Sequence, residues 1–407
     1  MWDAAIVGAG VAGLSCAIRA AEKGARVVLL DRRKEIGFPI RSTGGIAYYW
    51  AKKLGIPADE LDFAYKINKV FLVSPSCYKY GLSISDGESL DSTLPIMPSV
   101  GYVLDHGQFE KYLAAEAVKK GVELIINCRV DSLDKLRKHF PAKFYVGADG
   151  PYSTVRRGLG IPDNGEKDVA VGFEYWLPKE LFNVKDEGIY VHYNIIAGDG
   201  YSWWFPYKDY VKVGLGVSLH YARKMNIKDL EELLKDYLQL FLIDYPATGY
   251  VLNPNKMDPF KGLYGYVVNR VGGVIPVPPP LNRVVYGKVA LIGDAGNIIN
   301  SAVGGGIATS MFSGQMCGDA IAEGDLEIYQ KDYRKRLYPF LMRWYKLKRL
   351  IYEKLSREDL DRFVSLLSVG PYVPRSANPL RALSGALWHV ARRDIRLMFK
   401  IIGGLLW

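Results

Sequence analysis

The feature that most constrains the fold is a glycine pattern near the amino terminus, Gly8-Ala-Gly10-Val-Ala-Gly13. The apolar run "AAIV" precedes it, an alanine-rich helical stretch follows it, and a second apolar run ends at Asp31. A strand, a glycine turn, a helix and a second strand within about thirty residues are typical of a dinucleotide-binding βαβ unit. Gly8 permits the tight turn, Gly10 lets the backbone approach a pyrophosphate, and Gly13 allows the helix to pack closely.

The helix after this turn is expected to begin where a phosphate would bind. Its amino end offers free N–H groups and the positive end of the helix dipole. Asp31 can accept hydrogen bonds from an adenosine ribose, and we place the adjacent Arg32 in the same predicted site. A glycine-rich turn without a ligand is the alternative interpretation, and this pattern alone does not separate NAD from FAD.

Two further motifs favour FAD. The first, "VGADG", ends a predicted strand at Asp149 and Gly150. The second, "ALIGDAG" at 290–296, contains Gly293 and Asp294, and the Asp294 carboxylate is suited to the ribityl hydroxyls of a flavin. A glycine-rich helix start follows, where the backbone can lie against an isoalloxazine ring. The predicted contacts at this helix start are Gly304, Gly305, Gly306 and Ile307.

Composition limits the class of protein. The 407 residues are 49% hydrophobic and 24% charged, which is the balance of a globular chain. Four well-separated cysteines and five histidines without ligand spacing predict neither a disulfide framework nor a metal site. Residues 331–407 carry 17 Lys and Arg against 6 Asp and Glu, whereas the whole chain has a net charge of +10. A solvated helical face and an anionic lipid surface both explain this local charge, but no recognition fold for nucleic acid accompanies it.

The chain changes its pattern between the two ends. Residues 105–122 have helical spacing, whereas about 170–275 is aromatic and β-branched, which predicts antiparallel strands interrupted by one helix at 227–243. The stretch "VIPVPPPLNR" at 274–283 predicts a connector without regular structure. We expect an α/β fold in which a discontinuous Rossmann-like FAD-binding domain carries an inserted antiparallel β-sheet (α+β) substrate domain and a helical carboxyl-terminal region. The predicted boundaries are 1–70, 97–170 and 284–330 for the FAD-binding domain, 71–96 and 171–283 for the substrate domain, and 331–407 for the basic helical region.

Residues 200–206 read "GYSWWFP" and contain four aromatic side chains. Because alternate residues of a strand share a face, we expect Tyr201, Trp203 and Phe205 on one side of the sheet. Ser202 and Trp204 are then expected on the other side. Aromatic rings supply a large apolar area with little rotamer freedom, which suits the wall of a site for a long apolar ligand. An ordinary strand of a hydrophobic core is the alternative.

Together, these motifs resemble the FAD-dependent hydroxylase superfamily, which has the fold of p-hydroxybenzoate hydroxylase. Within it the chain is most similar to the geranylgeranyl reductases, above all the archaeal digeranylgeranylglycerophospholipid reductases. The resemblance covers roughly residues 1–330. Residues 201–206 match the YxWxFP core of the isoprenoid-binding motif of these reductases. Residues 293–307 are similar to their flavin loop, and 102–113 to a segment that enters a helix beside the cofactor.

The resemblance implies roles for individual residues. It implies that Arg41 and Ser42 lie near the flavin, and that the aromatic motif contacts a prenyl chain. We assign no conventional catalytic acid or base, and Tyr201 and Ser42 are the candidates for a proton relay. The implied substrate-binding residues are Tyr201, Trp203, Phe205 and Pro206.

The sequence departs from the family pattern at four positions. Ser42 stands in the place of a cysteine, and His106 in the place of an arginine. Ser301 and Gly198 each stand in the place of a proline. These departures leave room for a shifted substrate.

We therefore predict an FAD-dependent reductase that hydrogenates isolated double bonds of geranylgeranyl chains by hydride transfer from the reduced flavin plus a proton. Archaeal ether-lipid precursors, or a related prenyl compound, are the implied substrates. One alternative is a flavin monooxygenase or halogenase acting on an aromatic compound, and another is a prenyl-lipid- or flavin-binding protein without turnover. The external electron donor is left open between a ferredoxin, a nicotinamide such as NAD(P)H, a deazaflavin and other reductants.

The same reasoning predicts where the protein is found. No uninterrupted apolar run reaches about 18 residues, so no membrane-spanning helix is expected. Residues 379–407 interleave apolar and basic positions and are expected to lie on an anionic membrane surface. Packing on the rest of the protein, or an oligomer contact, is the alternative. We predict a cytoplasmic location, with peripheral contact at the inner face of the membrane.

Overall fold

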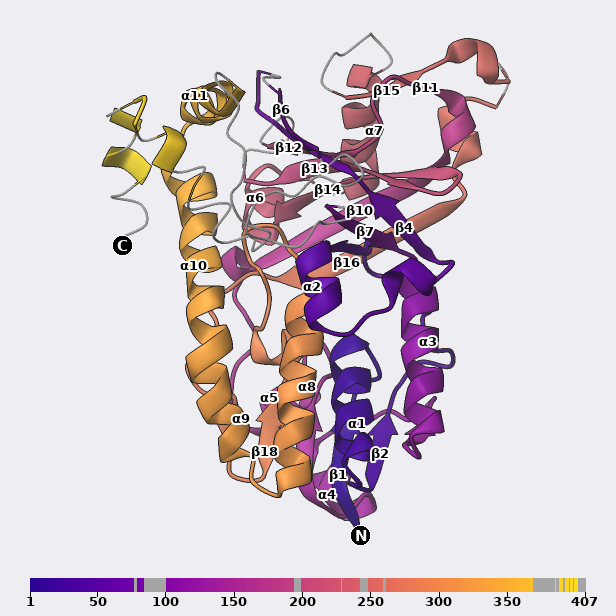
Figure 1. The fold of residues 1–407 in the computed structure, drawn as a ribbon, viewed down its shortest axis with the longest axis vertical. Coiled ribbons are helices and arrows are strands. Elements are labelled where there is room, and N and C mark those ends of the chain that lie inside the picture. The colour runs from indigo at the N-terminus through magenta and orange to yellow at the C-terminus, as the bar shows by residue number, and fades with distance from the viewer. Residues whose placement is uncertain are drawn as a thin grey trace. The chain divides into compact units, whose positions relative to one another are not determined.

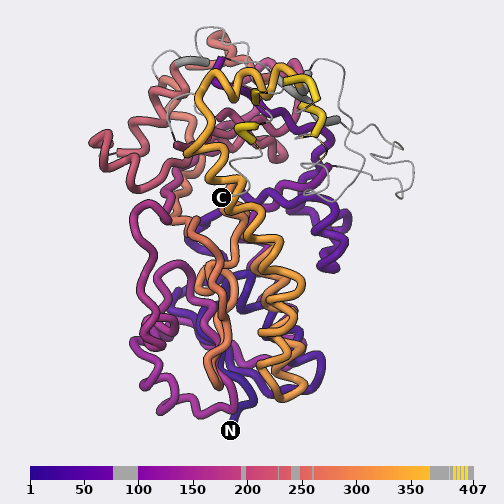
Figure 2. The backbone as a smooth tube through the Cα atoms, turned by 90° about the vertical axis from the view of Figure 1, so that its left-hand side faces the viewer, coloured from indigo at the N-terminus to yellow at the C-terminus, as the bar shows by residue number. Residues whose placement is uncertain are grey.

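The computed structural model describes residues 1–76, 79–83, 100–193, 199–227, 229–241, 248–258, 261–368, 385, 388–390, 392–394, 396–397 and 399–401. The chain forms two compact units, each built from segments that are far apart in the sequence. In Figure 2 the indigo, magenta and orange parts of the trace come together in the first unit. The first unit comprises Met1–Ile40, Asp105–Val169 and Val274–Tyr345, and the second comprises Arg41–Leu104, Ala170–Gly273 and Lys346–Trp407.

A six-stranded sheet of order β17-β18-β9-β1-β2-β8 lies at the centre of the first unit. The paired strands are parallel except for β17, which runs antiparallel to β18. The last four residues of β1 and all of β2 are buried apolar residues, as expected for a parallel sheet covered on both faces. The strands are β1 (Trp2–Val7), β2 (Val27–Leu30), β8 (Glu123–Ile125), β9 (Ala142–Gly147), β17 (Val285–Tyr286) and β18 (Val289–Leu291).

This topology brings the three predicted motifs together. Because parallel strands end at the same edge of a sheet, the turns after β1, β2, β9 and β18 gather at one edge. Those turns carry the glycine pattern, Asp31, Asp149 and Asp294. The predicted α/β fold with a Rossmann-like βαβ unit is confirmed.

Two helices of the first unit pack with their backbones in contact. Figure 1 shows α1 (Val11–Glu22) and α8 (Ile307–Glu323) side by side. A methyl group added at Gly318 would lie 2.6 Å from the carbonyl oxygen of Cys16, and one at Gly314 would collide with the carbonyl of Ala12. The other helices of this unit are α3 (His106–Lys119), α4 (Leu133–His139), α5 (Thr154–Gly158), α9 (Glu327–Asp332) and α10 (Tyr338–Arg349), whose end belongs to the second unit.

The second unit is built on a seven-stranded sheet of order β16-β10-β14-β13-β12-β5-β6. The pairs from β10 to β12, and the pair β5 with β6, are antiparallel, whereas β12 and β5 are parallel. A long stretch of chain separates β5 from β12, so a parallel pairing is open to them. The strands are β5 (Lys69–Val73), β6 (Lys79–Ser83), β10 (Val169–Pro178), β12 (Ile189–Tyr193), β13 (Tyr201–Tyr207), β14 (Tyr210–Ser218) and β16 (Asn269–Pro276).

One face of this sheet packs against α7 (Leu230–Phe241). Trp204, Tyr237 and Tyr250 are fully buried in the resulting core. The smaller elements of the unit are β3 (Gly45–Ala47), β4 (Ala64–Ile67) and β7 (Gly101–Leu104), which form a three-stranded sheet, the pair β11 (Phe182–Val184) and β15 (Tyr250–Leu252), and the helices α2 (Tyr48–Lys53), α6 (Leu219–Lys224) and α11 (Arg357–Ser368).

The structure divides the chain at places that differ from the predicted domain boundaries. Residues 41–70, predicted in the FAD-binding domain, lie in the second unit, because β3 and β4 pair with β7 and because β5 joins the seven-stranded sheet. Residues 331–345 lie in the first unit rather than in a separate helical region.

Two local predictions need correction. Val274–Pro276, predicted as irregular connector, are the last residues of β16. A proline is tolerated there because β16 is an edge strand and Pro276 is its final residue. The helix predicted to begin at 227 begins at Leu230, the first residue of α7 (Leu230–Phe241).

The proposed membrane-facing stretch 379–407 lies mostly outside the described residues, as does Gly198. Across the described residues, every helix is too short or too polar to cross a membrane.

Candidate functional site

In the glycine turn after β1, Gly8 and Gly13 are required by close backbone contacts, whereas Gly10 is not. Gly8 has a φ of +103°, and a side chain there would collide with the carbonyl of Ala148. A side chain at Gly13 would collide with the carbonyl of Gly8. The nearest atom to a methyl group added at Gly10 is Oε1 of Glu110, at 3.6 Å, so protein packing does not demand a glycine here. Space kept open beside Gly10 fits a pyrophosphate approaching the backbone.

The helix α1 begins at this turn without a side chain that caps its amino end. Its N-cap residue Gly10 makes no side-chain hydrogen bond, and its first turn holds no acidic residue. The N–H groups of the first turn of a helix have no partner within the helix, so an anion stabilises them. The turn and the helix therefore fit the phosphates of FAD.

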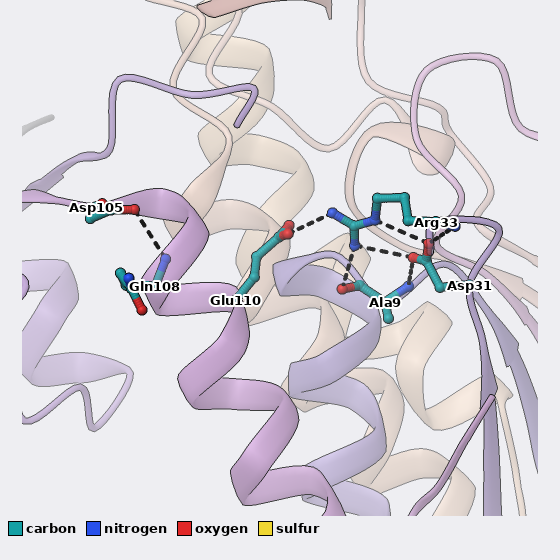
Figure 3. Close-up of polar contacts among 6 residues, drawn as sticks. All are labelled: Ala9, Asp31, Arg33, Asp105, Gln108 and Glu110. Carbon is teal, nitrogen blue, oxygen red and sulfur yellow. Dashed lines mark hydrogen bonds and ion pairs between the residues drawn. The ribbon is translucent and has the colours of Figure 1, made fainter. Parts of the chain in front are cut away.

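Asp31 is already surrounded by hydrogen-bond donors (Figure 3). Its Oδ2 accepts from the backbone N of Ala9 at 2.7 Å and from Nη2 of Arg33 at 3.1 Å. Its Oδ1 accepts from the backbone N and from Nε of Arg33, at 2.7 and 3.0 Å. A ribose hydroxyl would have to replace one of the Arg33 contacts, and ribose binding by Asp31 stays a prediction.

Arg33 bridges two buried carboxylates. Besides Asp31, it donates through Nη1 to Oε2 of Glu110 at 2.6 Å and through Nη2 to the carbonyl of Ala9 at 2.9 Å. Asp31 and Glu110 are each 5% exposed. Burial alone would raise the pKa of Asp31, but the hydrogen bonds and charge of Arg33 outweigh it and hold that pKa below its usual value.

We expect Arg33→Ala to destabilise the protein by about 3 kcal/mol at neutral pH, because two buried carboxylates lose their cation. The depressed pKa of Asp31 gives stability that is present above the ordinary carboxyl pKa, 3.8, and is lost as the pH falls through the lower folded pKa. The difference between wild type and variant should therefore shrink below about pH 4. Chemical denaturation across this range measures it, with Arg32→Ala as the control. A constant difference at all pH values would contradict this assignment.

The adjacent Arg32, which sequence analysis placed in the site, is exposed, and its contact with FAD stays a prediction; Arg33 makes the contacts with Asp31 and Glu110. Glu110 was not selected as a site residue, although the family resemblance of residues 102–113 implies that its helix lies beside the cofactor. It lies on α3, which begins with Asp105 accepting from the backbone N of Gln108 at 3.0 Å (Figure 3). Neither the arginine register nor the meeting of α3 with the glycine turn is visible in residue spacing.

Asp149, a predicted cofactor contact, caps the short helix α5. Its carboxylate accepts from the hydroxyl of Ser153 and from the backbone N of Thr154 at 2.7 Å. Burial raises the pKa of Asp149, and these hydrogen bonds oppose the increase. Gly150, with a φ of +82°, makes the turn that follows β9. For both residues, contact with FAD stays a prediction.

The helix α5 supports the turn after β18. Arg156 is 2% exposed and donates through Nη1 to Oδ1 of Asn297 at 2.9 Å. Its Nη2 donates to Oδ1 of Asn164 at 3.0 Å and to the carbonyl of Pro162. Asn297 follows the turn 293–296 in the left-handed conformation, with a φ of +54°. The second and third predicted motifs are thus joined by a buried arginine that sequence reasoning did not select.

Asp294 is the polar group most suited to a ligand in the first unit. Burial raises the pKa of its carboxyl to about 6. Among the residues that the structure describes, none makes a hydrogen bond to this carboxylate. A buried carboxylate without donors is costly, so hydroxyl donors from a ligand would stabilise it. This site fits the ribityl chain of FAD.

The predicted flavin-facing loop leads into α8. The backbone N of Asn300 donates to the carbonyl of Gly305 at 3.1 Å and closes the loop on itself. Gly304 has a φ of +62°. The helix begins at Ile307 with no side-chain cap from Gly306 and no acidic residue in its first turn. A second helix whose amino end has no side-chain cap therefore follows Asp294 in the same unit.

Arg41 and Ser42 lie in the second unit, unlike the other predicted cofactor residues. Arg41 is exposed, and Oγ of Ser42 accepts from the backbone N of Gly44 at 3.2 Å. Gly44 has a φ of +94°. Ser42 is thus part of a tight turn, and contact with the flavin stays a prediction for both residues.

The aromatic strand β13 has the predicted alternation. Trp204 packs in the core with Tyr250, with ring planes 11° apart. Tyr201 and Trp203 follow one another along the opposite face, with ring centroids 5.5 Å apart. A methyl group added at Gly214 of β14 would lie 2.5 Å from the indole of Trp203, so the absence of a side chain there makes room for this ring. Phe205 is half-buried on the same face, and Pro206, which points to the opposite face, is buried.

We call this side of the sheet the aromatic face. By strand register it carries Tyr201, Trp203, Phe205 and Tyr207 of β13, Lys212, Gly214 and Gly216 of β14, and Glu174 and Trp176 of β10.

Comparison with known proteins agrees with the FAD-binding protein that the motifs predict. The family of FAD dependent oxidoreductases matches residues 3–69. The digeranylgeranylglycerophospholipid reductase of Methanococcus vannielii is 27% identical over 387 residues, covering 88% of this chain and 89% of that protein. The predicted resemblance to this group of reductases is confirmed.

Solved structures show the same fold. A geranylgeranyl bacteriochlorophyll reductase-like protein from Thermoplasma acidophilum has a TM-score of 0.75 at 23% identity, covering 97% of this chain and 99% of that one. The probable FAD-dependent monooxygenase PqsL from Pseudomonas aeruginosa has a TM-score of 0.58 at 16% identity, covering 88% of this chain and 97% of that one. The fold is therefore shared by reductase-like proteins and a monooxygenase, and shape alone does not choose between them.

Proposed function

Because this chain is an FAD-dependent oxidoreductase, we propose that it reduces isolated double bonds in the prenyl chains of a lipid. The substrates we propose are geranylgeranyl chains on archaeal-type ether-lipid precursors, or a closely related prenyl compound. The names of its relatives in sequence support the reaction class, and the chemistry of the second unit supports an apolar substrate.

The observation that carries the proposal is the arrangement of β13. A strand that serves only as core has no need to place four further large rings on the face opposite its core contacts. Tyr201 and Phe205 are only half-buried there, whereas Trp204 is 1% exposed on the core side. Rigid rings give a long, flexible prenyl chain a large contact area at low entropic cost.

The first unit holds the residues that would bind FAD. The glycine turn and the start of α1 would receive the phosphates, Asp294 the ribityl hydroxyls, and the start of α8 the flavin end. Bound FAD, when reduced, supplies the hydride.

An unactivated alkene gives a protein few polar groups to bind. The chain's own contribution is therefore to orient the prenyl chain and to exclude water from it. Tyr201 is the proposed proton holder. Burial, and then the neighbouring Tyr193, raise the pKa of Tyr201 well above its usual value, so its hydroxyl keeps its proton at neutral pH.

The test is a single-substrate reduction. Protein reduced with dithionite is incubated without oxygen with a geranylgeranyl lipid, and the product mass is measured. We expect a gain of about two mass units per reduced bond, from one hydride and one proton. Bound flavin that is visibly reduced, with no gain in lipid mass, would contradict the proposal for that lipid. Oxygen consumption coupled to NAD(P)H oxidation with an aromatic substrate would instead identify a monooxygenase.

We further propose peripheral contact with an anionic membrane, because a prenyl lipid must be taken from one and because residues 331–407 are basic. Liposome flotation tests this by comparing the full chain with a chain truncated after Asn378. Equal flotation of the two would exclude the stretch 379–407 as the contact. We also propose an external electron donor, whose identity follows from comparing a ferredoxin, NAD(P)H and a deazaflavin as reductants of the bound flavin.

A further inference from the structure

We propose that Glu174 and Lys212 are positioning residues that hold the segment 41–45 against the aromatic face. Both side chains form hydrogen bonds with Thr43. The inference rests on the proposed function, because it assigns the segment a role in aligning a prenyl chain for reduction. It concerns residues of the second unit alone.

Glu174 is a buried carboxylate with three donors. It is 1% exposed, although it lies in the middle of a strand. Its Oε2 accepts from Oγ1 of Thr43 at 2.5 Å and from the indole N–H of Trp203 at 2.7 Å. Its Oε1 accepts from the indole N–H of Trp176 at 2.8 Å. An indole nitrogen can only donate, so the two oxygens of this one carboxylate meet the needs of both rings.

Lys212 holds the same segment through its backbone. It is fully buried, and its Nζ donates to the carbonyl of Thr43 at 2.8 Å and to that of Leu104 at 3.1 Å. Its charge also lies over the rings of Trp176 and Tyr207, 4.3 and 4.4 Å from their centroids. Carbonyl oxygens and aromatic faces both stabilise a buried ammonium group. Thr43 is thus held at its hydroxyl by Glu174 and at its carbonyl by Lys212.

Two glycines let the segment come this close to neighbouring groups. A side chain at Gly44 would collide with the carbonyl of Leu104. A methyl group at Gly45 would lie 2.8 Å from Cε2 of Phe205. The backbone that carries Ser42, Thr43 and Gly44 is therefore attached to the same sheet face as Trp203 and Phe205.

Stability alone is a poor reason for this arrangement. Two buried charged groups are costly, and apolar residues of similar size often give equal or greater stability. A network that links Thr43 with Trp203 does, however, fix the spacing between the turn of Ser42 and the aromatic rings. Small displacements of a reacting group lower rates strongly, so such a link is useful where a chain must be aligned.

The test uses a pair of substitutions at Thr43. Thr43→Val keeps the shape and removes the hydroxyl that Glu174 accepts from, whereas Thr43→Ser keeps the hydroxyl. We expect Thr43→Val to lower kcat for prenyl reduction about tenfold, with KM for the lipid changed less than about twofold, because the indole contacts of Glu174 persist. Thr43→Ser should stay within about twofold of wild type in both constants. Glu174→Gln should lower kcat and also raise KM, because an amide leaves one indole N–H without an acceptor.

Two measurements separate alignment from a merely structural role. FAD content should match wild type in both Thr43 variants, and Thr43→Val should lose no more stability than one hydrogen bond to a buried carboxylate, about 1–3 kcal/mol. Tryptophan fluorescence should shift in Thr43→Val and not in Thr43→Ser, because Thr43 and the indole of Trp203 share Oε2 of Glu174. Equal kcat in Thr43→Val and wild type, an increase in KM alone, or an equal loss in both Thr43 variants would each overturn the inference. If wild-type protein reduces no prenyl lipid, the proposed function fails, and the tryptophan fluorescence of the two variants still decides whether Thr43 aligns the segment with Trp203.

Discussion

Asp294→Asn is expected to stabilise the FAD-free protein and to weaken its binding of FAD. The wild-type side chain is half-buried and its carboxyl receives no hydrogen bond from the described residues, and desolvation raises its pKa from 3.8 to about 6. An uncharged amide avoids the cost of ionising a buried group. We expect a gain in unfolding free energy on the order of 2 kcal/mol at pH 7. FAD affinity should fall at least about tenfold, because an amide is a weaker acceptor for ribityl hydroxyls.

The raised pKa of Asp294 also predicts how folding stability and FAD affinity change with pH. In the FAD-free protein, a raised carboxyl pKa contributes stability that is fully present below the unfolded pKa of 3.8 and is lost as the pH rises through the folded pKa of about 6. Wild type should therefore lose stability relative to Asp294→Asn between about pH 4 and pH 6. FAD affinity of wild type should rise over the upper part of this range, because hydroxyl donors favour the ionised carboxylate. The variant should show neither trend.

Denaturation of FAD-free protein and fluorescence titration with FAD measure the two effects. Asp134→Asn is the matched control, because its side chain is 93% exposed in the same unit and should change neither quantity. A variant that is less stable than wild type at pH 7 would show that Asp294 has a structural partner. Unchanged FAD affinity would remove Asp294 from the cofactor site.

The parts of the fold that could be predicted from sequence are those controlled by local geometry. Gly13 is required by the carbonyl of Gly8 in the same turn, and Gly8 by its own φ of +103°, so this turn can be predicted from the local sequence. The alternation along β13 is also local, because a strand has a fixed period of two. Trp204 therefore points to the core and Trp203 away from it, as predicted.

The residues that were missed depend on contacts between distant segments. Arg33 acts with Glu110 only because α3 packs beside the glycine turn. In the sequence, Glu174 and Lys212 are isolated charged residues within predicted strands. Their shared contact with Thr43 forms only because β10 and β14 pair in register and Thr43 lies against both side chains. The domain boundaries differed for the same reason, since the pairing of β3 and β4 with β7 is invisible in composition.

Gly214→Ala is expected to have a large effect on prenyl reduction, although it adds a single methyl group. That group would lie 2.5 Å from the Trp203 indole and 2.7 Å from the carbonyl oxygen of Phe173, closer than such atoms can approach, so the ring and the backbone beside it must move. Trp203 also donates to Glu174 at 2.7 Å, and a shifted ring breaks this hydrogen bond. We expect a loss of about 1–3 kcal/mol in stability and a fall of at least about tenfold in kcat/KM for the lipid. FAD content should be unchanged, because the glycine turn, Asp294 and the start of α8 lie in the other unit.

Gly216→Ala is the matched control, two residues along the same strand and on the same face. A methyl group at Gly216 would lie 3.6 Å from Cζ3 of Trp203, which is an ordinary contact. An alanine inside a strand also loses less conformational entropy on folding than a glycine, so this variant should be as stable as wild type or slightly more so. Steady-state kinetics and thermal unfolding of both variants decide the matter. If the two variants behave alike, the position of Trp203 does not govern the reaction; if only Gly214→Ala loses activity while both keep FAD, the aromatic face is the surface that the lipid requires.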